Sequence, residues 1–182
     1  LRLKSVICLY TWSGVPQNTA PASINCCVVA SFGATRPPSL GVERYAYLWK
    51  KHVAAVNRDD ARLIDELKHQ MDREPYALSF SLKQHPAVEL YTLHAVPKDK
   101  QPIREVRALA ASHEIANASR AILAGDFNLA PKSTDPLLSA VGFTGHIAQP
   151  TSLNSVVRNG KYASRQYDNI YTKDMTICTA GV

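Results

Sequence analysis

The sequence predicts an α/β or α+β protein, in which strands and helices are intermixed along one chain. Residues 120–126, RAILAGD, place the run Ala-Ile-Leu-Ala before a glycine, a pattern typical of a strand that is buried on both faces. Residues 102–119 begin with a proline, PIREVRALAAS, and carry an apolar stripe, which is typical of an amphipathic helix. The 182 residues are enough for one domain with a substantial core.

The composition is that of an ordinary globular protein, with 46% hydrophobic and 20% charged residues. No apolar run approaches the ~18 residues of a membrane span and no signal peptide is visible, so we expect a soluble protein, cytoplasmic or secreted. The four cysteines lack C-x-x-C spacing, which argues against a zinc site. The net charge of +6 favours polyanionic partners such as nucleic acid, although many basic proteins bind none. No protein partner is inferred.

The first 42 residues differ from the rest because they contain no Asp or Glu and three of the four cysteines. Within them only INCCVVASF, residues 24–32, has the apolar and β-branched content of a strand. RYAYLWKK, residues 44–51, alternates aromatic with small or apolar residues and predicts a strand, and HVAAV, residues 52–56, predicts its partner or continuation.

The segment RDDARLIDELKHQMD, residues 58–72, predicts a helix because Leu63, Ile64 and Leu67 have helical spacing, and Pro75 ends this pattern. The remaining elements are a short helix at 136–141 and strands at 76–82 (YALSFSL), 88–96 (VELYTLHAV), 120–126 and 166–171 (QYDNIY).

Candidate functional residues lie where the buried strand ends, in AGDFN. Strand side chains alternate between faces, so Phe127 can enter the core while Asp126 and Asn128 point together beyond the sheet edge. Two hard oxygen ligands on a stiff support suit a magnesium ion, a water or a phosphate. The alternative is that Asp126 and Asn128 only shape a tight turn.

His94 and Asp168 occupy similar positions. His94 comes at the end of VELYTL and before a proline-containing loop, and Asp168 lies in YDNI. Polar groups gathered at strand ends are a common way for α/β proteins to build a site. Taken singly, a histidine at a strand end is more often structural, so the joint pattern carries the prediction.

Five motifs in order, ERYAYLW, DREPYALSF, LHAVPKD, AGDFN and YDNIY, resemble the endonuclease/exonuclease/phosphatase superfamily, and within it bacterial members of the deoxyribonuclease I-like branch. The resemblance covers residues 41 to 173. It implies part of a four-layer α/β/β/α sandwich with mixed, mainly antiparallel sheets in residues 43–182, preceded by a divergent or replaced segment, residues 1–42.

The resemblance also implies roles for single residues. His94 matches a histidine thought to protonate the leaving oxygen, and Glu43 the carboxylate that orients it. Arg73 matches a phosphate-contacting arginine. Asp126 and Asn128 match a pair that binds the divalent cation and the phosphate.

A further match is Asp168, which corresponds to an aspartate that supports a second histidine near the carboxyl terminus. Alternative interpretations remain open for three of these residues. Glu43 can be a solvated charge at a strand edge, Arg73 a surface residue at a helix terminus, and Asp168 a turn residue before its strand.

Three expected parts of the superfamily pattern are missing from the sequence, and the first is the family's opening strand with an asparagine near the phosphate. With no acidic residue before position 43, the metal-ligating glutamate of a Gln-Glu motif is absent, and with no histidine after His146, so is the base of a Ser-Asp-His motif. We therefore expect a partial chain, incomplete at both termini. A cation held by Asp126 and Asn128 alone would bind weakly, because affinity grows with the number of anionic oxygens.

These considerations predict a phosphodiesterase that depends on Mg²⁺, with Mn²⁺ or Ca²⁺ as alternatives, and that acts as an endonuclease on DNA. The alternatives are a phosphatase or phospholipase of the same fold, or an inactive remnant that binds nucleic acid.

Overall fold

The computed structural model describes residues 8–12, 27–33, 44–50, 54–82, 85–158 and 160–177. Its main feature is a seven-stranded sheet in the order β4-β6-β7-β8-β12-β9, with β5 also paired to β6. The strands of this sheet are β4 (Ala54–Val56), β5 (Arg62–Leu63), β6 (Tyr76–Leu82), β7 (Val88–His94), β8 (Ala121–Asp126), β9 (Thr144–Gly145) and β12 (Asp168–Lys173).

The sheet is mixed but mainly antiparallel, as predicted, because β7 and β8 form its one parallel pair in the described part of the chain. A parallel pair needs a crossover connection. Here α1 (Pro102–Ala111) and α2 (His113–Asn117) supply it. The crossover brings the carboxyl ends of β7 and β8 to the same sheet edge.

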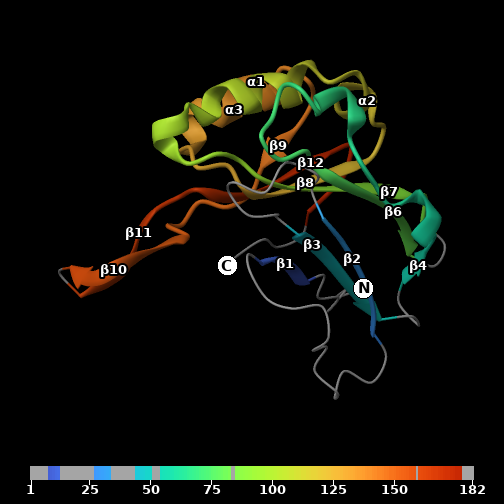
Figure 1. Cartoon of the computed structure of the whole chain (residues 1–182), viewed down its shortest axis with the longest axis horizontal. Coiled ribbons are helices and arrows are strands. Elements are labelled where there is room, and N and C mark those ends of the chain that lie inside the picture. Colours follow the sequence, from blue (N-terminus) through green and yellow to red (C-terminus); the bar gives the residue numbers. More distant parts are fainter. Residues whose placement is uncertain are drawn as a thin grey trace.

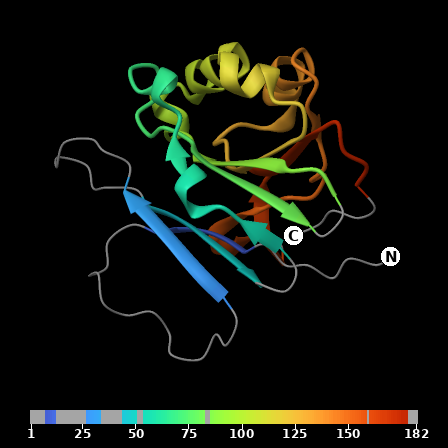
Figure 2. The same cartoon turned by 90° about the vertical axis from the view of Figure 1, so that its right-hand side faces the viewer.

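The elements form layers, which Figure 1 shows from the side. Helices α1, α2 and α3 (Pro131–Ser139) cover one face of the large sheet. The second sheet, β1 (Cys8–Trp12), β3 (Arg44–Lys50) and β2 (Cys27–Gly33), lies against the other face (Figure 2). The predicted α/β sandwich is confirmed. Among the described residues no helix covers the outer face of the small sheet, so three of its four layers are seen.

Two hydrophobic clusters hold the layers together. The cluster between the helices and the large sheet includes Leu93, Leu109 and Phe127, all fully buried. The cluster between the two sheets is rich in tyrosine: the Tyr47 hydroxyl donates to the carbonyl oxygen of Tyr76 at 2.5 Å, and the two rings stack with centroids 5.4 Å apart. Apolar burial and ring stacking both stabilise the packing of the sheets.

The helix predicted over residues 58–72 is wrong. The structure has two 3-10 turns there, Arg58–Asp60 and Asp65–Leu67, separated by β5. The Ile64 amide donates to the Pro75 carbonyl at 3.1 Å, which ties the segment to the start of β6. Ile64 and Leu67 are nevertheless buried, so the turns satisfy the apolar spacing that suggested a helix.

The other helices differ from expectation in their limits. The predicted helix 102–119 is broken at Ser112, whose backbone is extended and whose hydroxyl accepts from the Ile115 amide at 3.2 Å, capping α2. Helix α3 begins at Pro131, before the expected residue 136. The strand predicted at 76–82 is found with the same ends, and those predicted at 88–96, 120–126 and 166–171 are found with shifted ends. The predicted strands at 44–51 and 52–56 correspond to β3 and β4, and residues 51–53 lie outside the described part.

Strands elsewhere in the chain were predicted less completely. The predicted strand at 24–32 corresponds to β2, and residues 24–26 lie outside the described part. The strands β9, β10 (Ser152–Arg158) and β11 (Lys161–Arg165) were not expected.

Every helix in the described part of the chain is too short or too polar to cross a membrane.

Candidate active site at the ends of three adjacent strands

The strand register brings three of the predicted residues into one row. His94, at the end of β7, is opposite Asp126 at the end of β8, and Asp126 is opposite Asp168 at the start of β12. Residues directly opposite in a sheet project from the same face. Val88 and Leu90, which share the parity of His94 in β7, pack in the cluster between the two sheets. The row therefore lies on the face that carries the small sheet.

The side chains of this row are close and half-buried. His94 Nε2 is 4.0 Å from Asp126 Oδ2, and 28% and 31% of the two side chains are exposed. Burial raises the pKa of Asp126 above its ordinary value; the Asn128 amide opposes this change and the negative charge of Asp168 adds to it. Two neighbouring carboxylates at a partly buried edge form a site that a positive charge would stabilise.

The AGDFN segment combines the two interpretations that the sequence left open. Asp126 Oδ1 accepts a hydrogen bond from the Asn128 amide at 2.8 Å, so the aspartate does shape the turn, and Asn128 has the left-handed φ of 51° that asparagine tolerates. The second carboxylate oxygen of Asp126, Oδ2, faces His94. Phe127 is fully buried, as expected.

Gly125 allows β8 to approach β7 at this point. Its φ is +152°, and a Cβ atom there would lie 1.9 Å from the carbonyl oxygen of Leu93. No larger residue fits without moving the backbone. The glycine thus fixes the distance between the strands that end in His94 and Asp126.

Arg73 joins the row from a bend that precedes β6, and it is not at a helix terminus. Its Nη1 lies 3.3 Å from His94 Nδ1, and its Nη2 donates to the Ala95 carbonyl oxygen at 3.1 Å. A guanidinium can only donate. The contact with His94 is therefore a hydrogen bond only when Nδ1 carries no proton, which places the proton of the neutral ring on Nε2, facing Asp126.

The Ala95 carbonyl oxygen is a shared anchor of the site. Besides Arg73 it accepts from Asn128 Nδ2 at 2.8 Å, and the Ala95 amide donates to the Asp126 carbonyl oxygen at 2.8 Å. The loop after β7 therefore fixes two of the predicted side chains through its backbone. Glu43, the sixth of the predicted site residues, lies outside the described residues.

Glu105 supports this loop, although nothing in the sequence-based prediction pointed to it. Its carboxylate accepts from the amides of Asp72 and Val96, both at 2.8 Å, and it is 1% exposed. Glu105 thus joins the segment before Arg73 to the loop that contains Ala95. Burial raises the pKa of this carboxyl, and its two amide donors oppose that change. An acidic residue next to Val106 on the buried stripe of α1 was the available signal.

Thr151 was also missed. Its hydroxyl oxygen accepts from the amides of Tyr167 and Asp168, at 3.1 and 2.9 Å, and so fixes the start of β12. A threonine in a loop gives no indication in the sequence of which backbone it will cap.

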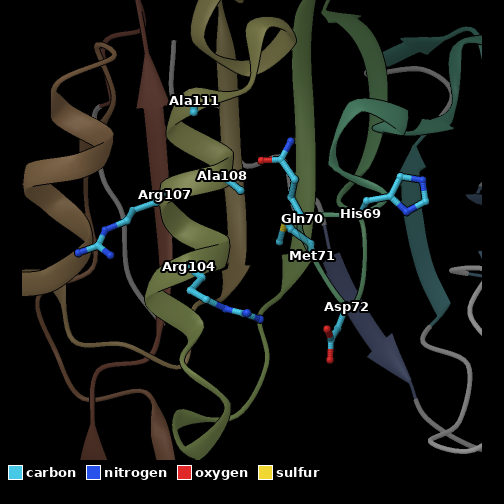
Figure 3. A pocket seen from close by; sticks show the side chains of 8 residues that line it. All are labelled: His69, Gln70, Met71, Asp72, Arg104, Arg107, Ala108 and Ala111. Atoms are coloured by element: carbon cyan, nitrogen blue, oxygen red, sulfur yellow. The ribbon is translucent and has the colours of Figure 1, made fainter.

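A groove of about 610 Å³ lies between α1 and residues 69–72 (Figure 3). Arg104 extends across it toward Asp72, whereas Arg107 points away to the other side of α1. One wall is α1, which carries Glu105, and the other is the segment that ends at Asp72, whose amide donates to Glu105. Its lining carries charges of both signs and includes none of the row residues.

Comparison with known proteins gives a match in structure alone. No family model matches the sequence, and no curated protein matches it. A functionally unknown conserved protein from Enterococcus faecalis V583 is similar in structure, with a TM-score of 0.57, 15% identity, and coverage of 80% of this chain and 65% of that chain.

An endonuclease/exonuclease/phosphatase family protein from Bacteroides thetaiotaomicron has a TM-score of 0.56 and 14% identity, with coverage of 80% and 61%. TDP2 from D. rerio, in complex with a single-strand DNA product, has a TM-score of 0.51 and 16% identity, with coverage of 80% and 62%. The chain thus spans less than two thirds of the length of each. The fold expected from the sequence resemblance is confirmed: the chain has the fold of these solved structures, which include endonuclease/exonuclease/phosphatase family proteins.

Proposed function

We propose that the chain is a metal-dependent phosphodiesterase that hydrolyses nucleic acid, with its active site at the row of His94, Asp126 and Asp168. The observation that supports this most is the register itself, which places an imidazole and two carboxylates on one face at the same sheet edge. The guanidinium of Arg73 lies beside them.

Arg73 and His94 would act on the substrate. The donors of a guanidinium match the oxygens of a phosphate and stabilise its negative charge. With Arg73 donating to Nδ1, the neutral ring of His94 carries its proton on Nε2, on the side of Asp126, from which it can donate a hydrogen bond to the leaving oxygen. Water attacks the phosphorus as the bond to that oxygen breaks, and the proton that the water gives up passes to the leaving oxygen. Removing one positioned donor of this kind commonly costs ~100- to 1,000-fold in rate.

Asp126, Asn128 and Asp168 are the residues that would hold a divalent cation, Mg²⁺ in the first instance. The described residues contain no group of three His, Cys, Asp or Glu side chains arranged for a metal. Two carboxylates that repel one another and a neighbouring amide fit a weakly held hard cation whose remaining ligands are water and phosphate. When bound, the cation would neutralise charge on the phosphate.

Two observations favour nucleic acid as the substrate. The chain has a net charge of +6, which favours polyanions through counterion release. The structurally similar TDP2 from D. rerio was obtained with a single-strand DNA product. DNA is the substrate we propose to test first.

The test uses the purified full chain and two substrates, supercoiled plasmid and the small diester bis(p-nitrophenyl) phosphate, each with Mg²⁺ and with EDTA. We expect hydrolysis with Mg²⁺ only, and a loss of ~100-fold or more in Asp126→Asn and His94→Gln. The matched controls are Asp59→Asn and His113→Gln, which make the same chemical changes at exposed positions away from the row.

Hydrolysis that persists in EDTA, or equal rates in Asp126→Asn and in Asp59→Asn, would overturn the proposal. Salt-sensitive DNA binding without hydrolysis of either substrate would instead support a protein that only binds nucleic acid.

A further inference from the structure

The strands β10 and β11 form a two-stranded sheet of their own, which we call the arm (residues 152–165). Figure 1 shows the arm projecting away from the body of the molecule. Its base is fixed at the active-site row. The Thr151 amide donates to the Arg165 carbonyl oxygen at 2.7 Å, and the Thr151 hydroxyl holds the Asp168 amide. The arm therefore begins within three residues of the proposed site.

The arm presents hydrophobic side chains to solvent. Tyr162 is 71% exposed and Val157 is 47% exposed, and these are the large hydrophobic side chains found exposed within the described ranges. A single exposed apolar residue is ordinary. Both of these, however, lie on one two-stranded ribbon, and an isolated ribbon of this kind is marginally stable in water.

The arm is also positively charged. Residues 152–165 contain Arg158, Lys161 and Arg165 and no acidic residue. Arg158 and Lys161 are partners in the strand register. A segment with this excess of positive charge favours a polyanionic partner.

We propose that the arm binds the single-stranded part of a polynucleotide substrate, outside the phosphodiester that is cleaved. Tyr162 stacks on an unpaired base, and the basic residues contact backbone phosphates. Proteins bind single strands without sequence preference by combining aromatic rings that stack on bases with cations that contact the backbone, and the arm carries one such exposed ring, Tyr162, among basic residues. This inference rests on the proposed function for its position along the substrate, but binding by the arm can be measured without hydrolysis.

The experiment measures binding of the full chain to a fluorescently labelled 20-nucleotide single-stranded DNA by anisotropy, in EDTA. We expect Tyr162→Ala to weaken binding by about 5- to 150-fold, the range for loss of one base–aromatic stack. Tyr162→Phe, the matched control, keeps the stack and should bind as the wild type does. Because Tyr162 is exposed, we expect both variants to keep the wild-type melting temperature.

The charge on the arm is tested by salt dependence. In the double variant Arg158→Gln/Lys161→Gln the slope of log K against log salt should fall by about 0.7 for each phosphate that the arm no longer neutralises. Equal affinities for wild type and Tyr162→Ala, with an unchanged salt slope in the double variant, would overturn the proposal. So would self-association that depends on Tyr162, measured by sedimentation, because it would assign the arm to a second copy of the chain.

Failure of the arm and failure of the proposed function give different results. Hydrolysis of bis(p-nitrophenyl) phosphate by the wild-type chain tests the site alone, and anisotropy in EDTA tests the arm alone. Binding that depends on Tyr162 without any hydrolysis would keep the arm and reject the enzyme. Hydrolysis by a chain whose DNA binding is unchanged in the arm variants would keep the enzyme and reject the arm.

Discussion

Gly125 is the residue whose replacement the backbone tolerates least. A Cβ there would meet the Leu93 carbonyl oxygen at 1.9 Å, and the strands on either side end in His94 and Asp126. We expect Gly125→Ala to lower the free energy of unfolding by more than about 3 kcal/mol, because the clash is with backbone and not with a flexible side chain. Urea denaturation of the purified variant measures this.

Gly160→Ala is the matched control for that prediction. Gly160 also has a positive φ, +71°, but a Cβ there would have nothing within 4 Å. Gly160→Ala should lower the free energy of unfolding by only ~1 to 2 kcal/mol, the cost of holding an alanine in the left-handed conformation. Equal losses in the two variants would show that backbone strain, and not the contact with Leu93, determines the cost at Gly125.

Glu105 joins the segment before Arg73 to the loop after β7, so its replacement should change the position of site residues on both. In Glu105→Ala the buried amide of Val96 and the part-buried amide of Asp72 lose their acceptor, which costs about 1 to 3 kcal/mol for the buried amide and less for the other. We expect kcat/KM for the small diester to fall as well, because the segments that carry Arg73 and Ala95 are no longer joined. Glu105→Gln keeps one acceptor oxygen, so its losses of stability and of kcat/KM should both be smaller. Full activity in a destabilised Glu105→Ala would contradict this link.

The pH dependence of stability gives a second test of Glu105. Burial raises its pKa in the folded chain above the ordinary value of about 4.3, so the folded state prefers the protonated carboxyl. The contribution of Glu105 to the free energy of unfolding is fully present below the ordinary pKa and is lost as pH rises through the raised pKa. Urea denaturation of wild type and Glu105→Gln from pH 4 to 8 should show the wild type losing stability relative to the variant. A difference that does not change with pH would contradict this.

The whole sandwich depends on strands from the segment that the sequence marks as divergent, residues 1–42. Both edges of β3 are covered, one by β1 and the other by β2, and β3 supplies Tyr45, Tyr47 and Trp49 to the cluster between the sheets. Without residues 1–42 both edges of β3 would be open, and open edges lead to aggregation. We therefore propose that residues 43–182 are not an independent domain.

A chain of residues 43–182 should aggregate or melt without cooperativity, as measured by size-exclusion chromatography and thermal unfolding. A chain that lacks only residues 1–7 keeps both strands and serves as the control. A monomeric 43–182 chain with the melting temperature of the full chain would show that the first segment is an appendage.

The sequence by itself determined the fold class, most strands and the residues of the row. Strand patterns of period two and the order of the five motifs are local properties, so AGDFN and LHAV could be placed at strand ends without coordinates. The segment at 58–72 shows the limit of this reasoning. Its apolar spacing fits a helix, but a hydrogen bond to Pro75, which no periodicity encodes, holds it in short turns.

The tertiary structure alone decided how the row is held. Strand register and chain crossing determine these contacts. They bring Arg73 to His94 and place Asp168 opposite Asp126. They also let Glu105 and Thr151 accept hydrogen bonds from backbone amides. These contacts join residues distant in the chain. Side-chain type and local pattern specify what a residue can do, whereas its partners depend on long-range packing, which one sequence does not show.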